Sequence, residues 1–482
     1  MPNRTSVARG TLLGITAQAW QMATAFILYH YLSKQLGPHG FGTWRVTLSV
    51  LNYFEVLVYT GVVQVASKHL AEDPSRRPVI ERGAWLAQGV LAATLFALLE
   101  LFAGVIAGAL NTPNLEPLIR IAALDLPFVA IMMLASNLRL GQHHFTRQAA
   151  SMMVYSTTKF LAICFLVWRG LSVPGALMGN VVASIVGFGV MFMPWKKAAV
   201  KVSDAAAEAK GMGIKGVPFF VQSLMSGVNT ESPLWFVQAF TGSATAGLYS
   251  SATVLAEIPD FLFAGLNRVL FPSIARAGAE NDEPLVARYV TQGVRLALLV
   301  TVLGVAVIAA TGRQALTFVY TPAFAAAAPT LTILMFAAVG HNIRSTCSEV
   351  MMARGQRKEA LGIVGVLTVI QVVALAIVTP IYGRVGAACV AAAGALVGGG
   401  VSVWILRSLV GRRVLWTLAR ASVSAAAVGI ALRFVRPAGL WLIPAYTAGA
   451  ALYALLLFAT REIDDDDKTS ISNVLRRKAA TS

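Results

Sequence analysis

The sequence predicts an all-α membrane protein that crosses the bilayer about fourteen times, and three observations support this prediction. The chain of 482 residues is 57% hydrophobic and only 13% charged, with a mean hydropathy of +0.69. A soluble protein of this length needs far more polar residues to cover its surface. Apolar runs close to the ~20 residues that cross a hydrocarbon core recur along the chain, and basic residues gather in the short loops between them.

The first apolar run follows a short, polar and basic N-terminus and has no small-residue cleavage pattern. We therefore expect a retained helix there and no cleaved signal peptide. Cys164, Cys347 and Cys389 each lie inside an apolar run, which indicates packing residues and neither a disulfide framework nor a metal site. The runs that meet the spanning length are near residues 10–32, 43–67, 82–109, 117–140, 147–168, 173–194, 214–238, 246–270, 289–311, 325–352, 359–381, 385–408, 413–433 and 438–460.

Seven tryptophans lie near the ends of these runs, as is typical of side chains that anchor a helix at the membrane interface. They are Trp44, Trp85, Trp168, Trp195, Trp404, Trp416 and Trp441.

The net charge of +17 is explained by the loops. With the N-terminus in the cytoplasm, about four basic residues fall on the cytoplasmic side for each one on the outer side, which is a clear positive-inside bias. No motif that interleaves aromatic and basic residues indicates a nucleic-acid partner. We expect a multi-pass protein of the plasma (inner) membrane with both termini in the cytoplasm.

Three short motifs recur about six predicted helices later, at offsets of roughly 205 to 214 residues. The pairs are Gly42–Leu51 with Gly247–Leu255, Arg139–His143 with Arg354–Arg357, and Pro174–Ala176 with Val385–Ala387. An even number of helices in each repeat gives both copies the same orientation in the membrane. The repeat therefore predicts two pseudo-symmetric six-helix lobes with a cavity between them, an arrangement that suits alternating access.

This repeat also predicts the division of the chain. The expected parts are an N-lobe at 1–195, a cytoplasmic linker at 196–213, a C-lobe at 214–410, two C-terminal helices at 411–460 and a cytoplasmic tail at 461–482.

Ionisable residues inside spanning segments usually face the bundle interior or a water-filled cavity. Several such residues share one helical face, above all in the equivalent runs 43–67 and 246–270. The cations suit an anionic headgroup such as a diphosphate, and they are Arg45, Lys68, Lys159, Arg268 and Arg344. The acids could couple transport to protons or sodium, and they are Glu55, Glu231, Glu257 and Asp260. The expected neutral cavity residues are Asn52, Tyr59, Gln222 and Asn229.

Structural roles stay open for several of these residues. Lys68 at a helix end could be a snorkelling anchor, and Arg268 could form a buried ion pair with Glu257 or Asp260. In the same way, Arg344 could neutralise Glu349 or cap a kink. Two further acids inside predicted helices are expected to be structural or to lie at interfaces, and they are Glu100 and Asp125.

Three motifs carry a resemblance to a known family. They are Leu36–Gly42 with Gly61 and Ala66–Lys68 around the second helix, Ala246–Ala252, and Leu270–Ala275. With the fourteen predicted spans, they resemble the polysaccharide transporter branch of the multidrug/oligosaccharidyl-lipid/polysaccharide (MOP) flippase superfamily. The resemblance implies a V-shaped transporter of two lobes whose helices 1, 2, 7 and 8 line the cavity.

Members of this branch flip polyprenyl-diphosphate-linked oligosaccharides such as O-antigen, capsule or exopolysaccharide repeat units, while related branches flip lipid II or export drugs. The resemblance implies a flippase and not an enzyme, and we expect no cofactor. The expected coupling ion is H⁺ or Na⁺. The expected partners are membrane lipid and polysaccharide polymerase or assembly proteins. The first helix has no basic residue beyond Arg9, whereas the lipid II branch tends to place arginines there.

Other functions fit the sequence less well. A cation-coupled multidrug exporter of the same fold should have an acidic or aromatic cavity, but here cations are in surplus. A membrane-embedded glycosyltransferase would need acidic catalytic residues in an outer loop, and the outer loops are short and nearly free of carboxylates. No Gly-rich nucleotide loop is present, which argues against ATP as the driving force. A structural protein that transports nothing stays an alternative.

Overall fold

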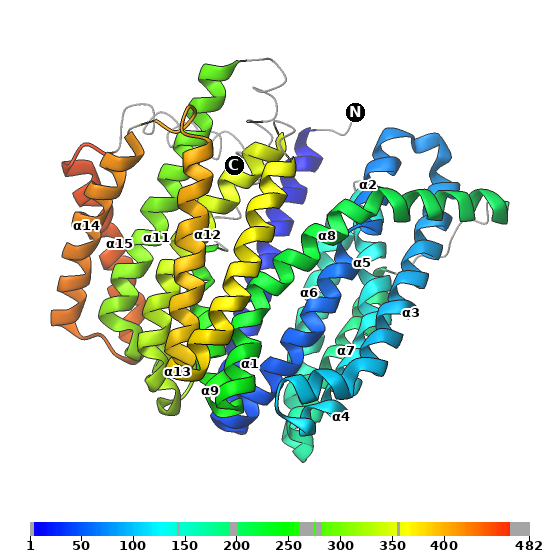
Figure 1. Cartoon of the computed structure of the whole chain (residues 1–482), viewed down its shortest axis with the longest axis horizontal. Helices are drawn as coiled ribbons and strands as arrows, with labels where there is room; N and C mark the ends of the chain where they lie inside the picture. Colours follow the sequence, from blue (N-terminus) through cyan, green and yellow to red (C-terminus); the bar gives the residue numbers. More distant parts are fainter. Residues whose placement is uncertain are drawn as a thin grey trace. The chain divides into compact units, whose positions relative to one another are not determined.

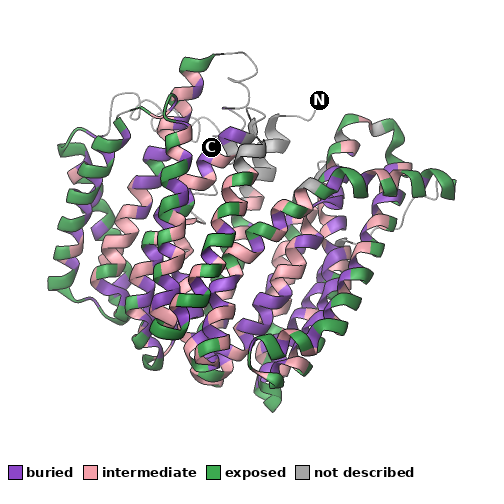
Figure 2. Ribbon diagram, viewed as in Figure 1, coloured by how far each residue is buried: buried purple, intermediate pink, exposed green. Residues whose placement is uncertain are grey.

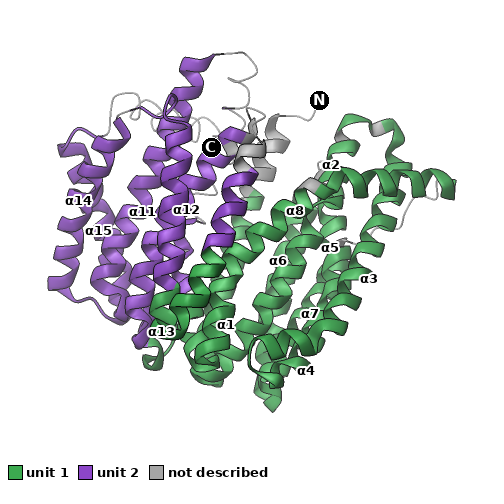
Figure 3. Cartoon of the chain, viewed as in Figure 1, with its two compact units in different colours: residues 1–250, 319–324, 371–387 green, residues 251–318, 325–370, 388–482 purple. Residues whose placement is uncertain are grey.

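The computed structural model describes residues 4–141, 145–191, 201–260, 274, 282–353, 357–411 and 413–462. Within these residues every regular element is a helix, which confirms the predicted all-α class (Figure 1). The chain divides into two compact units (Figure 3). Unit 1 comprises residues 1–250, 319–324 and 371–387, and unit 2 comprises residues 251–318, 325–370 and 388–482.

The helices of unit 1 are α1 (Arg4–Tyr59), α2 (Val62–Glu72), α3 (Arg77–Ala109), α4 (Glu116–Ala123), α5 (Asp125–Gly141), α6 (Phe145–Leu166), α7 (Ser172–Met191), α8 (Val202–Thr241) and most of α9 (Ser243–Ala256). Those of unit 2 are α11 (Glu283–Val319), α12 (Ala328–Ala353), most of α13 (Arg357–Ile405), α14 (Arg413–Val435) and α15 (Leu442–Ala459). The predicted division into two lobes, linker and tail stays a prediction.

Nine stretches of the described chain are long and apolar enough to cross a membrane. Three of them are 45 to 55 residues long. A straight helix of that length would measure roughly 70 to 80 Å, more than twice the hydrocarbon thickness. Each contains a glycine with positive φ, at Gly37 (φ 62°), Gly170 (φ 89°) and Gly383 (φ 56°). Because such backbone is natural only for glycine, these residues break the helix where the sequence analysis places a boundary between two spans.

The predicted count of fourteen spans stays open, because the predicted span 246–270 runs into residues 261–273, which lie outside the described part.

Burial follows the pattern of a protein in lipid. Large apolar side chains are exposed along the outer faces of α3, α13 and α14, for example Val90, Leu101 and Val423 (Figure 2). A water-soluble protein rarely exposes such long apolar faces, whereas a membrane-spanning helix must expose apolar side chains to lipid. The chain is therefore a multi-pass membrane protein.

Glycines of the two sequence repeats meet in unit 1. A Cβ atom added to Gly42 of α1 would lie 1.8 Å from the Ser243 carbonyl oxygen, and one added to Gly247 of α9 would lie 2.2 Å from the Pro38 carbonyl oxygen. The backbones approach so closely that only glycine fits at either position. The motifs that carry the family resemblance thus include a packing contact between α1 and α9.

Trp44 corrects one sequence-based expectation. Its side chain is 1% exposed, within a group of aromatic rings that includes Tyr29, Phe41 and Phe324. It is a core residue of unit 1, so the prediction of an interfacial anchor was wrong for this residue. Four of the other predicted anchors are exposed, namely Trp168, Trp404, Trp416 and Trp441.

Candidate functional site

Four predicted site residues of unit 1 lie in one polar group on α1 and α6. The Tyr59 hydroxyl donates a hydrogen bond of 2.6 Å to Glu55 Oε2, one helical turn earlier on α1. Lys159 Nζ of α6 lies 5.8 Å from the ring centroid of Tyr155, and its charge interacts with those of Glu55 and Arg45. All these side chains are half-buried. The group therefore combines cations with a carboxyl group inside a bundle of apolar helices.

Asp125, which the sequence analysis assigns to a structural role, belongs to the same group. It is the first residue of α5 and is 1% exposed. Its Oδ1 atom has no hydrogen-bond partner among the described residues, and its charge interacts with those of Glu55 and Lys159. A buried carboxyl group with an unused acceptor is costly unless a nearby cation or a proton compensates it. Asp125 is therefore, like Lys159, a candidate residue of the functional site.

One feature of the sequence sets Asp125 apart from an ordinary structural carboxylate. Asp125 has no basic residue within four positions, so no partner on its own helix can neutralise it. The same argument singles out Lys159. Glu100, in contrast, has a cation nearby, because Arg120 Nε lies 3.9 Å from its Oε2 atom.

Two contacts hold the Arg45 side chain of this group in place. Its Nε donates a hydrogen bond of 2.6 Å to Ser250 Oγ of α9, and its guanidinium carbon lies 5.9 Å from the Tyr29 ring centroid. Arg45 and Ser250 are equivalent positions of the first sequence repeat, as are Gly42 and Gly247. The close glycine contact therefore also sets the position of this guanidinium.

The remaining predicted residues of unit 1 are more scattered. The Asn229 side-chain amide donates to Gln371 Oε1 (3.1 Å), and Gln371 Nε2 donates to the Asn229 carbonyl oxygen (2.6 Å), so these two residues connect α8 with α13. Lys68 is 73% exposed at the end of α2, where its Nζ lies 3.6 Å from Glu72 Oε1. Lys68 and Glu72 therefore form an exposed ion pair at the end of a helix. Three further predicted residues are half-buried, namely Asn52, Gln222 and Glu231.

Unit 2 holds a second, smaller polar group. Asn342 Nδ2 of α12 donates a hydrogen bond of 2.6 Å to Asp260 Oδ1, and Glu257 interacts electrostatically with Asp260. One turn of α12 places Arg344 beside His341, with 3.1 Å between a guanidinium nitrogen and Nδ1. Arg268 lies outside the described residues, and so does its expected ion pair with Glu257 or Asp260.

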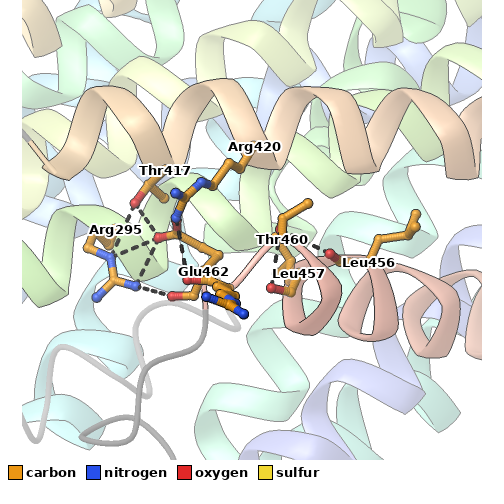
Figure 4. A network of polar contacts seen from close by, with 8 residues as sticks. Arg295, Thr417, Arg420, Leu456, Leu457, Thr460 and Glu462 are labelled. Atoms are coloured by element: carbon orange, nitrogen blue, oxygen red, sulfur yellow. Dashed lines mark hydrogen bonds and ion pairs between the residues drawn. The ribbon is translucent and has the colours of Figure 1, made fainter.

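A buried ion-pair network that the sequence analysis misses also lies in unit 2 (Figure 4). Arg295 of α11 bonds Glu462 Oε1 at 2.9 Å, and Thr417 and Arg420 of α14 bond the same carboxylate. The Glu462 side chain is 0% exposed although it follows the last helix and lies in the predicted tail. The network ties the end of α15 to α11 and α14. Its members lie far apart in the sequence, so no local pattern indicates it.

The described residues contain no group of three or more His, Cys, Asp or Glu side chains that could hold a metal ion.

Several solved structures share this fold at low sequence identity. One described as the lipid II flippase MurJ in an inward closed conformation matches with a TM-score of 0.79 and 12% identity, over 94% of this chain and 99% of that chain. An inward-facing multidrug resistance MATE family transporter of the MOP superfamily matches with a TM-score of 0.68 and 14% identity, over 84% of this chain and 95% of that one. A MOP superfamily transporter from Pyrococcus furiosus matches with a TM-score of 0.57 and 13% identity, over 84% and 95%.

The chain therefore has the fold of the MOP-superfamily transporters. Residues 7–278, more than half of the chain, match the model of a family described as polysaccharide biosynthesis protein, and the chain belongs to this family. No curated protein matches the chain in sequence. The family match and the shared fold confirm the resemblance found in the sequence at the level of family and fold.

Proposed function

We propose that the chain is a flippase that moves a polyprenyl-diphosphate-linked oligosaccharide from the cytoplasmic to the outer leaflet by alternating access. The substrate is a repeat unit of an O-antigen, a capsule or an exopolysaccharide. Family membership supports a role in polysaccharide biosynthesis, and the fold supports transport. The protein lies in the inner membrane with both termini in the cytoplasm, and polysaccharide polymerase or assembly proteins receive its product.

The observation that carries this proposal is the pair of half-buried cations in unit 1, Arg45 and Lys159, whose charges repel each other. Two cations inside a spanning bundle are costly, and a bound anion offsets this cost. A diphosphate offers several oxygens that accept from a guanidinium and an ammonium group at once. The polyprenyl tail stays in the lipid, so only the headgroup and sugars need a polar path. Arg268, Arg344 and Lys68 remain candidate ligands at other depths.

In this proposal, Lys159 also links substrate binding to proton binding. Without substrate, its ammonium group balances the carboxylates of Glu55 and Asp125. When the diphosphate binds Lys159, the carboxylates lose part of this compensation and one of them binds a proton. When the substrate leaves on the other side, Lys159 again balances the carboxylates and the bound proton is released there. Sodium could replace the proton, and Glu231, Glu257 and Asp260 remain candidates for the same coupling role.

The proposed site is tested in liposomes that contain the purified protein and a fluorescent polyprenyl-diphosphate oligosaccharide. We expect Lys159→Met to reduce the flipping rate at least tenfold, because it removes the ammonium group and keeps the apolar stem. Lys159→Arg should retain more activity because it keeps the charge. Lys201→Gln, an exposed charge change ahead of α8, is the matched control. Equal activity of Lys159→Met and the control would remove Lys159 from the site.

A cation-coupled drug exporter of the same fold is the second candidate, and the buried acid Asp125 is the observation that favours it. A lipid II-type flippase is the third. Transport of a lipophilic cation, or of lipid II in preference to the oligosaccharide lipid, would identify these functions in the same liposomes.

A further inference from the structure

An apolar groove of ≈ 530 Å³ lies between α3 and α8 in unit 1. Its walls include Leu86, Val90 and Leu91 of α3 and Val217 and Phe220 of α8. This volume is within the roughly 300 to 1,000 Å³ of pockets that hold small organic ligands. Among the described residues that line the groove, Lys210 carries the only charge.

Glycines create this groove. A Cβ atom on Gly83 of α3 would lie 2.9 Å from Glu208 Cβ, so α3 and α8 touch at this level. A Cβ atom on Gly216 would lie 3.1 Å from the Cα atom of Gly61, the residue with φ 69° that separates α1 from α2. Gly213, between these two contacts, has open space within 4 Å of its ideal Cβ position. Helix α8 therefore touches α3 at one level and the break between α1 and α2 at another, and the space over Gly213 between these contacts is unfilled.

The wall that α8 contributes is fixed by polar contacts on its opposite face. Glu208 Oε1 lies 2.8 Å from His69 Nδ1 of α2, and Arg76 donates a hydrogen bond of 2.9 Å to Glu208 Oε2. The Glu208 side chain is nearly buried, and Met212, one turn later, is fully buried against α2, α3 and α5. These contacts therefore hold the first turns of α8, and with them one wall of the groove, in position.

The surroundings of the groove are those of a membrane interface. Its rim continues into exposed apolar side chains, among them Val90, Ile214 and Val217, which face lipid in a spanning protein. Lys210 is exposed and has no ion-pair or hydrogen-bond partner among the described residues. Further cations lie at the same end of unit 1, including Arg82 and Lys215. An apolar slot beside an unpaired ammonium group matches an acyl chain beside a phosphate.

We propose that this groove binds one acyl chain of an anionic phospholipid, whose phosphate pairs with Lys210. The acyl chain fills the space over Gly213, and the negative headgroup complements the basic rim. With the orientation proposed above, the lipid comes from the cytoplasmic leaflet. This site is separate from the Lys159 group and does not depend on the identity of the transported substrate.

The full-length protein in a mild detergent tests the proposal. Bound lipid is counted by native mass spectrometry after addition of phosphatidylglycerol or phosphatidylcholine with identical acyl chains. We expect preferential retention of phosphatidylglycerol. Lys210→Gln should weaken its binding about fivefold, the equivalent of the ~1 kcal/mol that one basic residue contributes near an anionic membrane. Gly213→Leu should abolish retention of both lipids, because its side chain extends into the open space over this residue.

Lys201→Gln is the matched control, since it removes the same charge from a residue outside the groove. Glu208→Gln should also weaken retention, because it loosens the α8 wall and leaves Lys210 in place. An equal loss for Lys201→Gln and Lys210→Gln would mean only diffuse attraction to the basic surface and would overturn the proposal. Retention by Gly213→Leu, or displacement of phosphatidylglycerol by equimolar polyprenyl phosphate, would overturn it as well.

Discussion

Removal of the Glu462 carboxylate should destabilise unit 2 strongly. Glu462→Ala removes the carboxylate that lies 2.9 Å from the Arg295 guanidinium, whose side chain is only 6% exposed. Removing one member of a buried ion pair typically costs about 3 to 5 kcal/mol, because the other charge stays buried. The lost contact with Arg420, whose side chain is 38% exposed, should add at most about 1 kcal/mol because solvent screens it. We therefore expect a loss of about 4 kcal/mol, mainly because the buried Arg295 charge loses the Glu462 carboxylate.

The double variant Arg295→Met with Glu462→Met separates this cause from general disruption. It replaces both charges by apolar side chains, and such replacements of buried ion pairs are often neutral or even stabilising. We expect the double variant to be more stable than Glu462→Ala by at least about 2 kcal/mol. The assay is equilibrium unfolding in detergent micelles, followed by the total tryptophan fluorescence, to which Trp416 and Trp441 of unit 2 contribute. A loss below about 0.5 kcal/mol for Glu462→Ala, within the usual range for surface substitutions, would refute the reasoning.

Three further predictions concern unit 1. Gly42→Ala should prevent close packing of α1 on α9 and lower the yield of monodisperse protein in size-exclusion chromatography, because its Cβ atom would meet backbone that no side-chain rotation can move. Gly189→Ala, where the added Cβ atom meets nothing within 4 Å, is the control, and equal yields would contradict the packing argument. Trp44→Ala should cost about 3 to 5 kcal/mol in unfolding free energy, since it empties a buried site. The exposed Trp168→Ala should cost far less, and similar losses would show that Trp44 is not a core residue. Asp125→Asn should keep the fold, because a neutral amide is easier to bury than a carboxylate, but it should flatten the pH dependence of flipping, and an unchanged pH profile would exclude Asp125 from coupling.

The sequence was sufficient for the class and for the positions of the helix breaks. The thickness of the bilayer sets the length of each apolar run. The long helices and their interruptions at Gly37, Gly170 and Gly383 therefore lie where hydropathy predicts them. Lys159 and Glu55 were also accessible, because an ionisable residue in a spanning run is conspicuous.

Contacts between distant segments were not accessible from the sequence. The burial of Glu462 depends on Arg295, 167 positions earlier, and a charge beside the end of a helix otherwise indicates a solvated tail. Trp44 fits the pattern of an interfacial tryptophan in sequence, and only the packing of Phe41 and Tyr29 around it makes it a core residue. Asp125 was assigned to a structural role because the charges that surround it, those of Glu55 and Lys159, lie on α1 and α6, far away in the sequence.

The most direct test of the central claim is the movement of lipid by the wild-type protein. Liposomes that contain the purified protein would receive a fluorescent polyprenyl-diphosphate oligosaccharide in one leaflet, and a membrane-impermeant quencher would report its arrival in the other. The account predicts protein-dependent flipping that excess unlabelled oligosaccharide lipid suppresses. No flipping above protein-free liposomes, together with uptake of a lipophilic cation by the same preparation, would contradict the proposed function and support a drug exporter.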